Sequence, residues 1–128
     1  IEKKYKATLE EIKIENGYEF VRAAEEEVIL SLNETTKIVS TGGSAVYSKK
    51  SMQHLKSFSY IIYIETALET IINRIDVGQE RGLAVPDGLT IPEVYAEREP
   101  LYNQYADFIL DGSKSIQELT KLIQKDFF

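Results

Sequence analysis

The arginines are the residues of this chain best suited to bind a small anion. They are a minority of its 15 basic residues, namely Arg22, Arg74, Arg81 and Arg98. Arginine is favoured over lysine where a planar, bidentate grip on a carboxylate or phosphate group is needed. On scarcity alone, ordinary surface or ion-pairing residues are the simpler interpretation, so the arginines need support from neighbouring motifs.

A glycine-containing turn is the second candidate for ligand binding. The short β-branched stretch 37–40 predicts a strand, and Thr41-Gly42-Gly43-Ser44 follows it directly. In open α/β sheets, ligands bind beyond the carboxyl ends of the strands, and adjacent glycines allow a ligand to approach the backbone amides. A plain strand-to-helix turn explains the same residues equally well.

The remaining polar residues argue against several other kinds of chemistry. His54 is the only histidine and has no Ser, Asp or Cys partner at a suitable spacing, so we expect it to face solvent. One histidine and no cysteine cannot form a zinc site, and we predict no metal site in the chain. We expect the run Glu25–Glu27 to be solvated, and the helically spaced Tyr95, Tyr102 and Tyr105 to belong to the core.

The overall composition is that of one acidic globular domain. The chain has 128 residues, 43% of them hydrophobic, and a formal net charge of −6. This balance argues against a general nucleic-acid or anionic-membrane binder, although a small anion needs only a few local cations. No run approaches the length of a membrane span, and there is no cysteine. We therefore expect a cytoplasmic monomer that binds small molecules and neither nucleic acid nor membranes.

Hydrophobic periodicity predicts alternating helices and strands that would position these residues. The predicted helices cover residues 8–16, 18–32, 49–58, 66–75, 90–105 and 115–125, and the predicted strands cover 37–40, 60–64 and 108–110. Capping-box sequences mark two helix starts, at Thr8 with Glu11 and at Thr90 with Glu93. We expect Pro100 to kink the helix that contains it.

The order of these elements predicts the fold class. Residues 60–64 are continuously apolar, which is typical of a strand buried on both faces of a parallel sheet. The alternation therefore predicts an α/β fold whose parallel sheet is covered by helices on both faces. Residues 76–90 contain Gly and Pro and are long enough to form a lid. Three strands are few for so many helices, which indicates that the sheet lacks strands.

Four short stretches form a pattern when they are read in order. Val21-Arg22-Ala23-Ala24-Glu25 is similar to a Phe-Arg-x-x-Glu motif, and residues 40–46 are similar to a glycine-triplet substrate loop. Arg74 and Arg81 keep the spacing of an adenine-side arginine and a lid arginine, and Arg98-Glu99-Pro100-Leu101-Tyr102 is similar to an Arg-x-Pro-Leu-Tyr segment. Together these stretches resemble the shikimate kinase family of P-loop kinases, and the resemblance runs from Ile1 to the last strand.

The resemblance implies a three-layer P-loop kinase-like fold with a lid, and an activity. A protein of this family would phosphorylate the 3-hydroxyl of shikimate, with ATP as the phosphate donor and Mg²⁺ as the metal ion. In this chain, Arg22 and Arg98 would hold the substrate carboxylate, together with the backbone of Gly42 and Gly43. An acidic protein that binds two anionic ligands must concentrate its cations at the site, and the arginines would do so.

The resemblance also implies which residues bind ATP. Arg81, in the lid, is the implied catalytic residue, because it would close over the phosphates and stabilise charge on the transferring phosphoryl group. Arg74 would lie near the adenine, as would the turn that contains Ser115. A closing lid would exclude water, so that the phosphoryl group goes to the substrate hydroxyl.

The chain departs from the family pattern in three ways. Ser44 replaces the third glycine, and the lid begins Arg81-Gly82 instead of Arg-Pro, so a related kinase with a different hydroxy-acid acceptor is a second hypothesis.

No Gly-x-x-x-x-Gly-Lys-Ser/Thr motif occurs, and the family's P-loop and first two strands would precede Ile1. We therefore expect residues 1–128 to be the C-terminal portion of a single kinase domain, inactive without its P-loop. We also expect a gap in its sheet between residues 37–40 and 60–64. A degenerate, non-catalytic relative that binds an anion or a protein partner is the third hypothesis.

Overall fold

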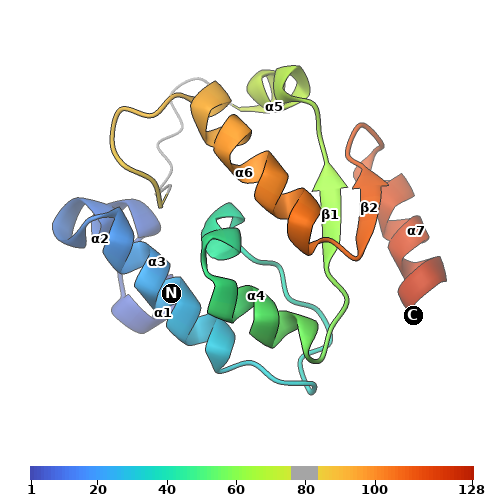
Figure 1. Cartoon of the computed structure of the whole chain (residues 1–128), viewed down its shortest axis with the longest axis horizontal. Helices are drawn as coiled ribbons and strands as arrows, with labels where there is room; N and C mark the ends of the chain where they lie inside the picture. Colours follow the sequence, from blue (N-terminus) through green and yellow to red (C-terminus); the bar gives the residue numbers. More distant parts are fainter. Residues whose placement is uncertain (76–83) are drawn as a thin grey trace.

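The computed structural model describes residues 1–75 and 84–128, which form helices around a small parallel sheet (Figure 1). In chain order the elements are α1 (Glu2–Tyr5), α2 (Leu9–Asn16), α3 (Tyr18–Leu30), the 3₁₀ helix η1 (Gly43–Tyr47), α4 (Lys49–Lys56), β1 (Ile62–Glu65), α5 (Leu68–Arg74), α6 (Ile91–Tyr105), β2 (Phe108–Asp111) and α7 (Ile116–Phe127). The predicted catalytic Arg81 and the first half of the predicted lid lie outside the described residues.

Side-chain caps fix where several helices begin. The hydroxyls of Thr8 and Thr90 each accept a hydrogen bond from the backbone N–H three residues later. Glu11 and Glu93 each accept one from the backbone N–H of the capping threonine, so both predicted capping boxes are confirmed. A third capping box, at Ser115, begins α7. In the described ranges, no helix is both long enough and apolar enough to cross a membrane.

The sheet has helices on both faces, as predicted. Strands β1 and β2 pair in parallel, in a register that aligns Ile62 with Phe108. Successive residues of a strand point to opposite faces, so Tyr63 lies on the face opposite Phe108. Tyr63 packs against Tyr102 of α6, with ring centroids 5.2 Å apart, and Phe108 packs against Phe127 of α7 at 4.9 Å. Helices α6 and α7 therefore cover opposite faces of the two strands (Figure 1).

The predicted strand at residues 37–40 is wrong, because these residues have no regular secondary structure. A cavity of about 390 Å³ lies between this stretch and β1 and is lined by Val39 and Thr41 as well as by Ile61 and Ile62. A strand needs a neighbour whose backbone N–H and C=O groups complete its hydrogen bonds. Nothing in residues 1–75 or 84–128 supplies that neighbour, and the cavity lies where we expect a gap in the sheet.

The predicted burial of residues 60–64 on both faces is also wrong. Strand β1 begins only at Ile62, Tyr60 is 72% exposed and Ile64 is 44% exposed. One edge of β1 pairs with β2, whereas residues near its start line the cavity just described. The apolar composition of residues 60–64 is thus that of a central strand. In the described residues, however, β1 has a neighbouring strand on one side only.

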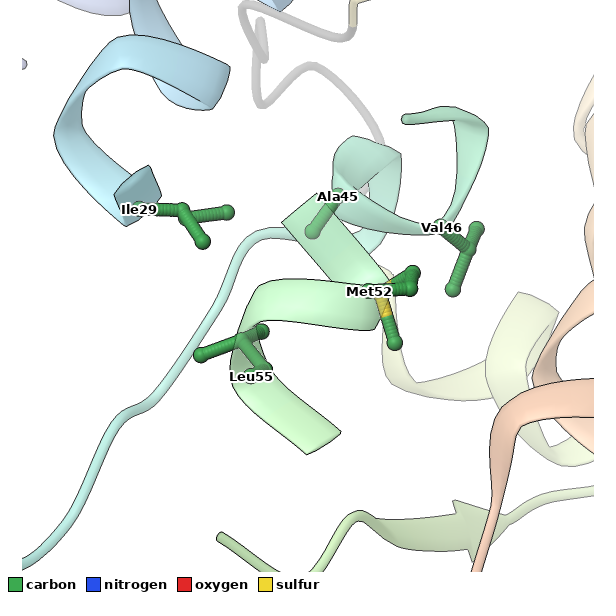
Figure 2. Close-up of a cluster of buried hydrophobic side chains, with 5 residues drawn as sticks. All are labelled: Ile29, Ala45, Val46, Met52 and Leu55. Carbon is green, nitrogen blue, oxygen red and sulfur yellow. The ribbon is translucent and has the colours of Figure 1, made fainter. Parts of the chain in front are cut away.

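The main hydrophobic core lies between α3, η1 and α4 (Figure 2). Its members are all 7% exposed or less: Ile29, Ala45, Val46, Met52 and Leu55. A second cluster joins α2, α3 and the segment after residue 83 through Ile12, Val21 and Ala84. Because Ala45 and Val46 are both buried, η1 is fixed against α3, and its end residues Gly43 and Tyr47 have defined positions.

Candidate anion-binding site

Arg98 is a buried cation that forms no ion pair with any of the described residues. It lies on α6 and is 8% exposed, and its Nε donates a hydrogen bond to the Tyr47 hydroxyl at 3.3 Å. Its Nη2 atom is buried and has no hydrogen-bond partner. None of the ion pairs formed within the described ranges involves Arg98. Burying a guanidinium without a carboxylate is costly, and such a group favours binding an anion.

Arg22 lies beside Arg98 and is held by aromatic rings. Its Cζ is 3.8 Å from the centroid of Tyr47 and 4.9 Å from the centroid of Tyr18. Its Nε donates to the carbonyl oxygen of Ala84 at 2.7 Å. Arg98 approaches the same Tyr47 ring, with its Cζ 5.5 Å from the centroid. The structure therefore brings together the two arginines that we assigned to a substrate carboxylate, and Tyr47 lies between them.

The glycine turn closes against the same arginine. A Cβ atom placed on Gly43 would lie 2.5 Å from Nη1 of Arg98 and 2.8 Å from the hydroxyl of Tyr102. The Tyr102 hydroxyl donates to the Gly43 carbonyl oxygen at 2.9 Å. A side chain at residue 43 would therefore displace the guanidinium or the phenol. Glycine is required here for a close approach, which a plain turn does not explain.

A cavity of about 290 Å³ opens beside the glycine turn. Gly42 and Gly43 line it together with Tyr63 and Tyr102. Burial raises the pKa of the Tyr63 hydroxyl to about 12. Burial also raises the pKa of Tyr102, although the nearby Arg98 opposes that shift. Both phenols stay protonated at neutral pH and add no negative charge. The Tyr63 hydroxyl can therefore donate a hydrogen bond to a ligand, whereas the Tyr102 hydroxyl already donates its proton to Gly43.

The expectation that Glu25–Glu27 is a solvated run is wrong for Glu25 and Glu26, which are half-buried, whereas Glu27 is exposed. Glu25 accepts a hydrogen bond from the Ser44 hydroxyl, and Glu26 accepts one from the Ser48 hydroxyl. Glu27 pairs with Lys4 at 2.7 Å. The first two contacts attach the two ends of the η1 segment to α3. Their partners are 19 and 22 residues away in the sequence, so helical periodicity carries no signal of these contacts.

The prediction for His54 is also corrected, whereas that for Tyr102 is extended. His54 does not simply face solvent: it is half-buried, its Nε2 lies 2.7 Å from the Leu32 carbonyl oxygen, and its ring packs edge-on against Phe58 at 5.3 Å. It therefore joins the end of α3 to α4. Tyr102, which we assigned to the core, does pack against the main core, and its hydroxyl also contacts the glycine turn. No sequence prediction named Tyr47, although it directly follows the buried Ala-Val pair of the glycine-containing stretch.

The residues assigned to the nucleotide lie around a different turn. Arg74, at the end of α5, donates from Nη1 to the Gly112 carbonyl oxygen at 3.0 Å. Gly112 lies in the turn between β2 and α7, where Ser115 is the cap of α7 and accepts a hydrogen bond from Glu118 N at 3.2 Å. The structure therefore places Arg74 at the turn that we predicted to share its ligand. No group of carboxylates and histidines in the described ranges could hold a metal ion.

Comparisons with known proteins show which family the chain belongs to. The sequence pattern of the shikimate kinase family matches residues 1–127. The chain is 35% identical to the shikimate kinase of Bordetella pertussis over 118 residues, an alignment that covers 87% of this chain and 53% of that protein. The chain thus spans about half the length of that curated relative.

Solved structures show the same fold. The crystal structure of shikimate kinase from Aquifex aeolicus superimposes with a TM-score of 0.77 at 25% identity, covering 97% of this chain and 74% of that one. Shikimate kinase from Acinetobacter baumannii, solved in complex with shikimate, gives a TM-score of 0.74 at 24% identity over 99% of this chain and 75% of that one. The α/β arrangement is that of a P-loop kinase, and the chain belongs to the shikimate kinase family.

Proposed function

We propose that the protein carrying this chain transfers the γ-phosphoryl group of ATP to the 3-hydroxyl of shikimate. The observation that supports this most directly is Arg98, a buried guanidinium whose Nη2 has no partner and which lies against the glycine turn. A ligand carboxylate would supply the missing counter-charge. The relative from Acinetobacter baumannii was solved with shikimate, a small hydroxy acid of this kind.

The two arginines would bind and orient the acid. Arg98 would use Nη2 to reach the carboxylate, and Arg22, stacked on the Tyr47 ring, would offer its outer nitrogens. Holding the carboxylate fixes where the hydroxyls of the acid lie. Phosphoryl transfer depends mostly on such positioning and on electrostatic stabilisation. The phenol of Tyr63 would serve as a neutral donor in the adjoining cavity, which Tyr102 also lines.

The nucleotide would lie on the side of Arg74. The Arg74 guanidinium is planar and is attached to the β2–α7 turn, so an adenine ring could stack on it beside Ser115. The resemblance assigns Arg81 to the phosphates as the catalytic arginine, although this residue lies outside the described ranges. Mg²⁺ stays a prediction from the family. The described residues offer no cluster of ligands for it, and we derive no step through it.

Ser44 does not by itself indicate a changed acceptor. Its hydroxyl is bound to Glu25, and its backbone follows the turn at Gly43. The side chain that departs from the family pattern is thus attached to α3. A kinase for a different hydroxy acid and a non-catalytic relative remain the alternative hypotheses.

The experiment that tests the proposal is shikimate-dependent release of ADP. It uses the product of the complete open reading frame, because residues 1–128 contain no Gly-x-x-x-x-Gly-Lys-Ser/Thr motif. We expect ADP release that requires both ATP and shikimate. ADP release with another hydroxy acid, but not with shikimate, would support a changed acceptor. Absence of ATP binding would support the non-catalytic relative.

A further inference from the structure

Tyr47 is the residue that the two arginines of the site share. Arg22 stacks on its ring at 3.8 Å, and Arg98 donates to its hydroxyl at 3.3 Å with its Cζ 5.5 Å from the ring centroid. Among the hydrogen bonds and cation–π contacts of the described residues, those of Tyr47 alone involve both guanidinium groups. One aromatic side chain thus sets the relative position of two cations that come from α3 and α6.

The backbone at Tyr47 is well placed for this purpose. Tyr47 ends η1, and the two residues before it, Ala45 and Val46, are buried in the main core. The residue after it, Ser48, caps α4 and donates to Glu26. The ring therefore extends from a fixed point of the fold, and its position does not depend on the ligand.

The chemistry of the ring explains why a tyrosine suits this position. Two guanidinium groups near one another repel, and a carboxylate placed between them would neutralise the charge that an anionic ligand needs. An aromatic face attracts a cation through its quadrupole and carries no net charge, and the phenol oxygen accepts a hydrogen bond. Tyr47 can therefore hold both arginines in place and leave their positive charge available.

We propose that Tyr47 is a positioning residue that prearranges Arg22 and Arg98 for a carboxylate ligand. The proposal rests on the proposed function for the identity of that ligand. It assigns no step of the reaction to Tyr47, because the residue acts through the two arginines.

The test compares two substitutions in the complete gene product. Tyr47→Leu removes the ring and the hydroxyl, whereas Tyr47→Phe keeps the ring that stacks on Arg22 and removes only the acceptor used by Arg98. Tyr60→Leu is the matched control, since Tyr60 packs on Phe108 and Phe127 instead of on an arginine. Circular dichroism establishes that each variant is folded.

The first readout is the pair of Nε–Hε resonances of Arg22 and Arg98 in ¹H–¹⁵N spectra without ligand. A proton above an aromatic face is shifted upfield by the ring current. We expect the Arg22 signal to move downfield in Tyr47→Leu and to stay in place in Tyr47→Phe. The Arg98 signal is expected to move in both variants, because both lose the hydroxyl. If neither signal moves in a folded Tyr47→Leu variant, the inference is wrong.

The second readout is the affinity for shikimate, measured by calorimetry, together with KM and kcat. We expect Tyr47→Leu to raise Kd and KM about tenfold and Tyr47→Phe to raise them about threefold, with kcat changed less than KM. Unchanged affinity in Tyr47→Leu would overturn the inference. If the unsubstituted protein binds no shikimate, the proposed function fails, and the arginine resonances still decide the role of Tyr47.

Discussion

Replacing Arg98 with methionine separates a ligand-binding role from a structural role. Methionine keeps much of the length and apolar volume of the arginine stem and removes the charge. Among the described residues, Arg98 donates from Nε to Tyr47, and its Nη2 is buried without a hydrogen-bond partner. A residue retained for stability would have its donors satisfied. We therefore predict that Arg98→Met weakens ligand binding and stabilises the free protein.

The two magnitudes follow from these contacts. Loss of a bidentate, charge-assisted contact with a carboxylate costs about 2–4 kcal/mol, which corresponds to roughly a 30- to 700-fold rise in Kd for shikimate. In the unliganded protein, the substitution removes the desolvation penalty of an unpaired guanidinium and loses one hydrogen bond of about 1 kcal/mol. We expect a net gain of about 1 kcal/mol, or a rise of about 3–4 °C in Tm.

Calorimetric titration with shikimate and thermal unfolding without ligand measure these two quantities. The matched control is Lys49→Met, which removes one exposed positive charge at the start of α4 and is expected to leave both quantities nearly unchanged. A fall of several degrees in Tm with an unchanged Kd would refute the reasoning, because Arg98 would then be a structural residue whose charge is compensated in the native protein.

Two further predictions concern contacts around the sheet and the turn. Gly43→Ala places a Cβ 2.5 Å from Arg98 Nη1, so we expect the Kd for shikimate to rise more than about tenfold. In Gly42→Ala the new Cβ contacts only the flexible end of Glu25, so this variant is the milder control in the same titration. The hydrogen bond from Ile61 N, aided by Lys56, holds the pKa of Asp107 below its usual range. The ionised Asp107 carboxylate therefore stabilises the fold fully above about pH 4, and this contribution is lost as the pH falls through the lower folded-state pKa. Asp107→Asn should lower the free energy of unfolding at pH 7 by about 0.5–1 kcal/mol and should flatten the decline of that free energy below about pH 4. Urea titration at several pH values measures both effects, and equal losses at about pH 3 and pH 7 would contradict this account.

Local signals in the sequence were sufficient for the helices. The capping boxes at Thr8 and Thr90 depend on residues three positions apart, and the structure places both helix starts where these residues predict them. A strand depends on a partner far away in the chain. The stretch 37–40 has β-branched residues, but a cavity lies between it and β1, so its composition alone does not make it a strand.

The charged residues of the candidate site could be predicted from the sequence, whereas the side chain that positions them could not. The family resemblance selected Arg22, Arg98 and the glycine turn, and the structure brings them together. Neither residue spacing nor the motifs identified Tyr47, because its role depends on two arginines that converge only in the folded chain. Arg74 also lies at the turn predicted for it, where it donates a hydrogen bond to the backbone carbonyl of Gly112. A motif of side chains carries no signal of a bond to a backbone carbonyl.

The carboxylates of α3 show how an acidic chain can keep an anion site positive. Glu25 and Glu26 follow Arg22 by three and four residues, the spacing at which helical ion pairs form. In the structure they accept hydrogen bonds from Ser44 and Ser48 instead, and neither is paired with Arg22. The serines therefore attach η1 to α3 through two carboxylates, and neither carboxylate forms an ion pair with Arg22. A net charge of −6 is thus compatible with a ligand carboxylate, because the charges nearest the site are arranged by these specific hydrogen bonds.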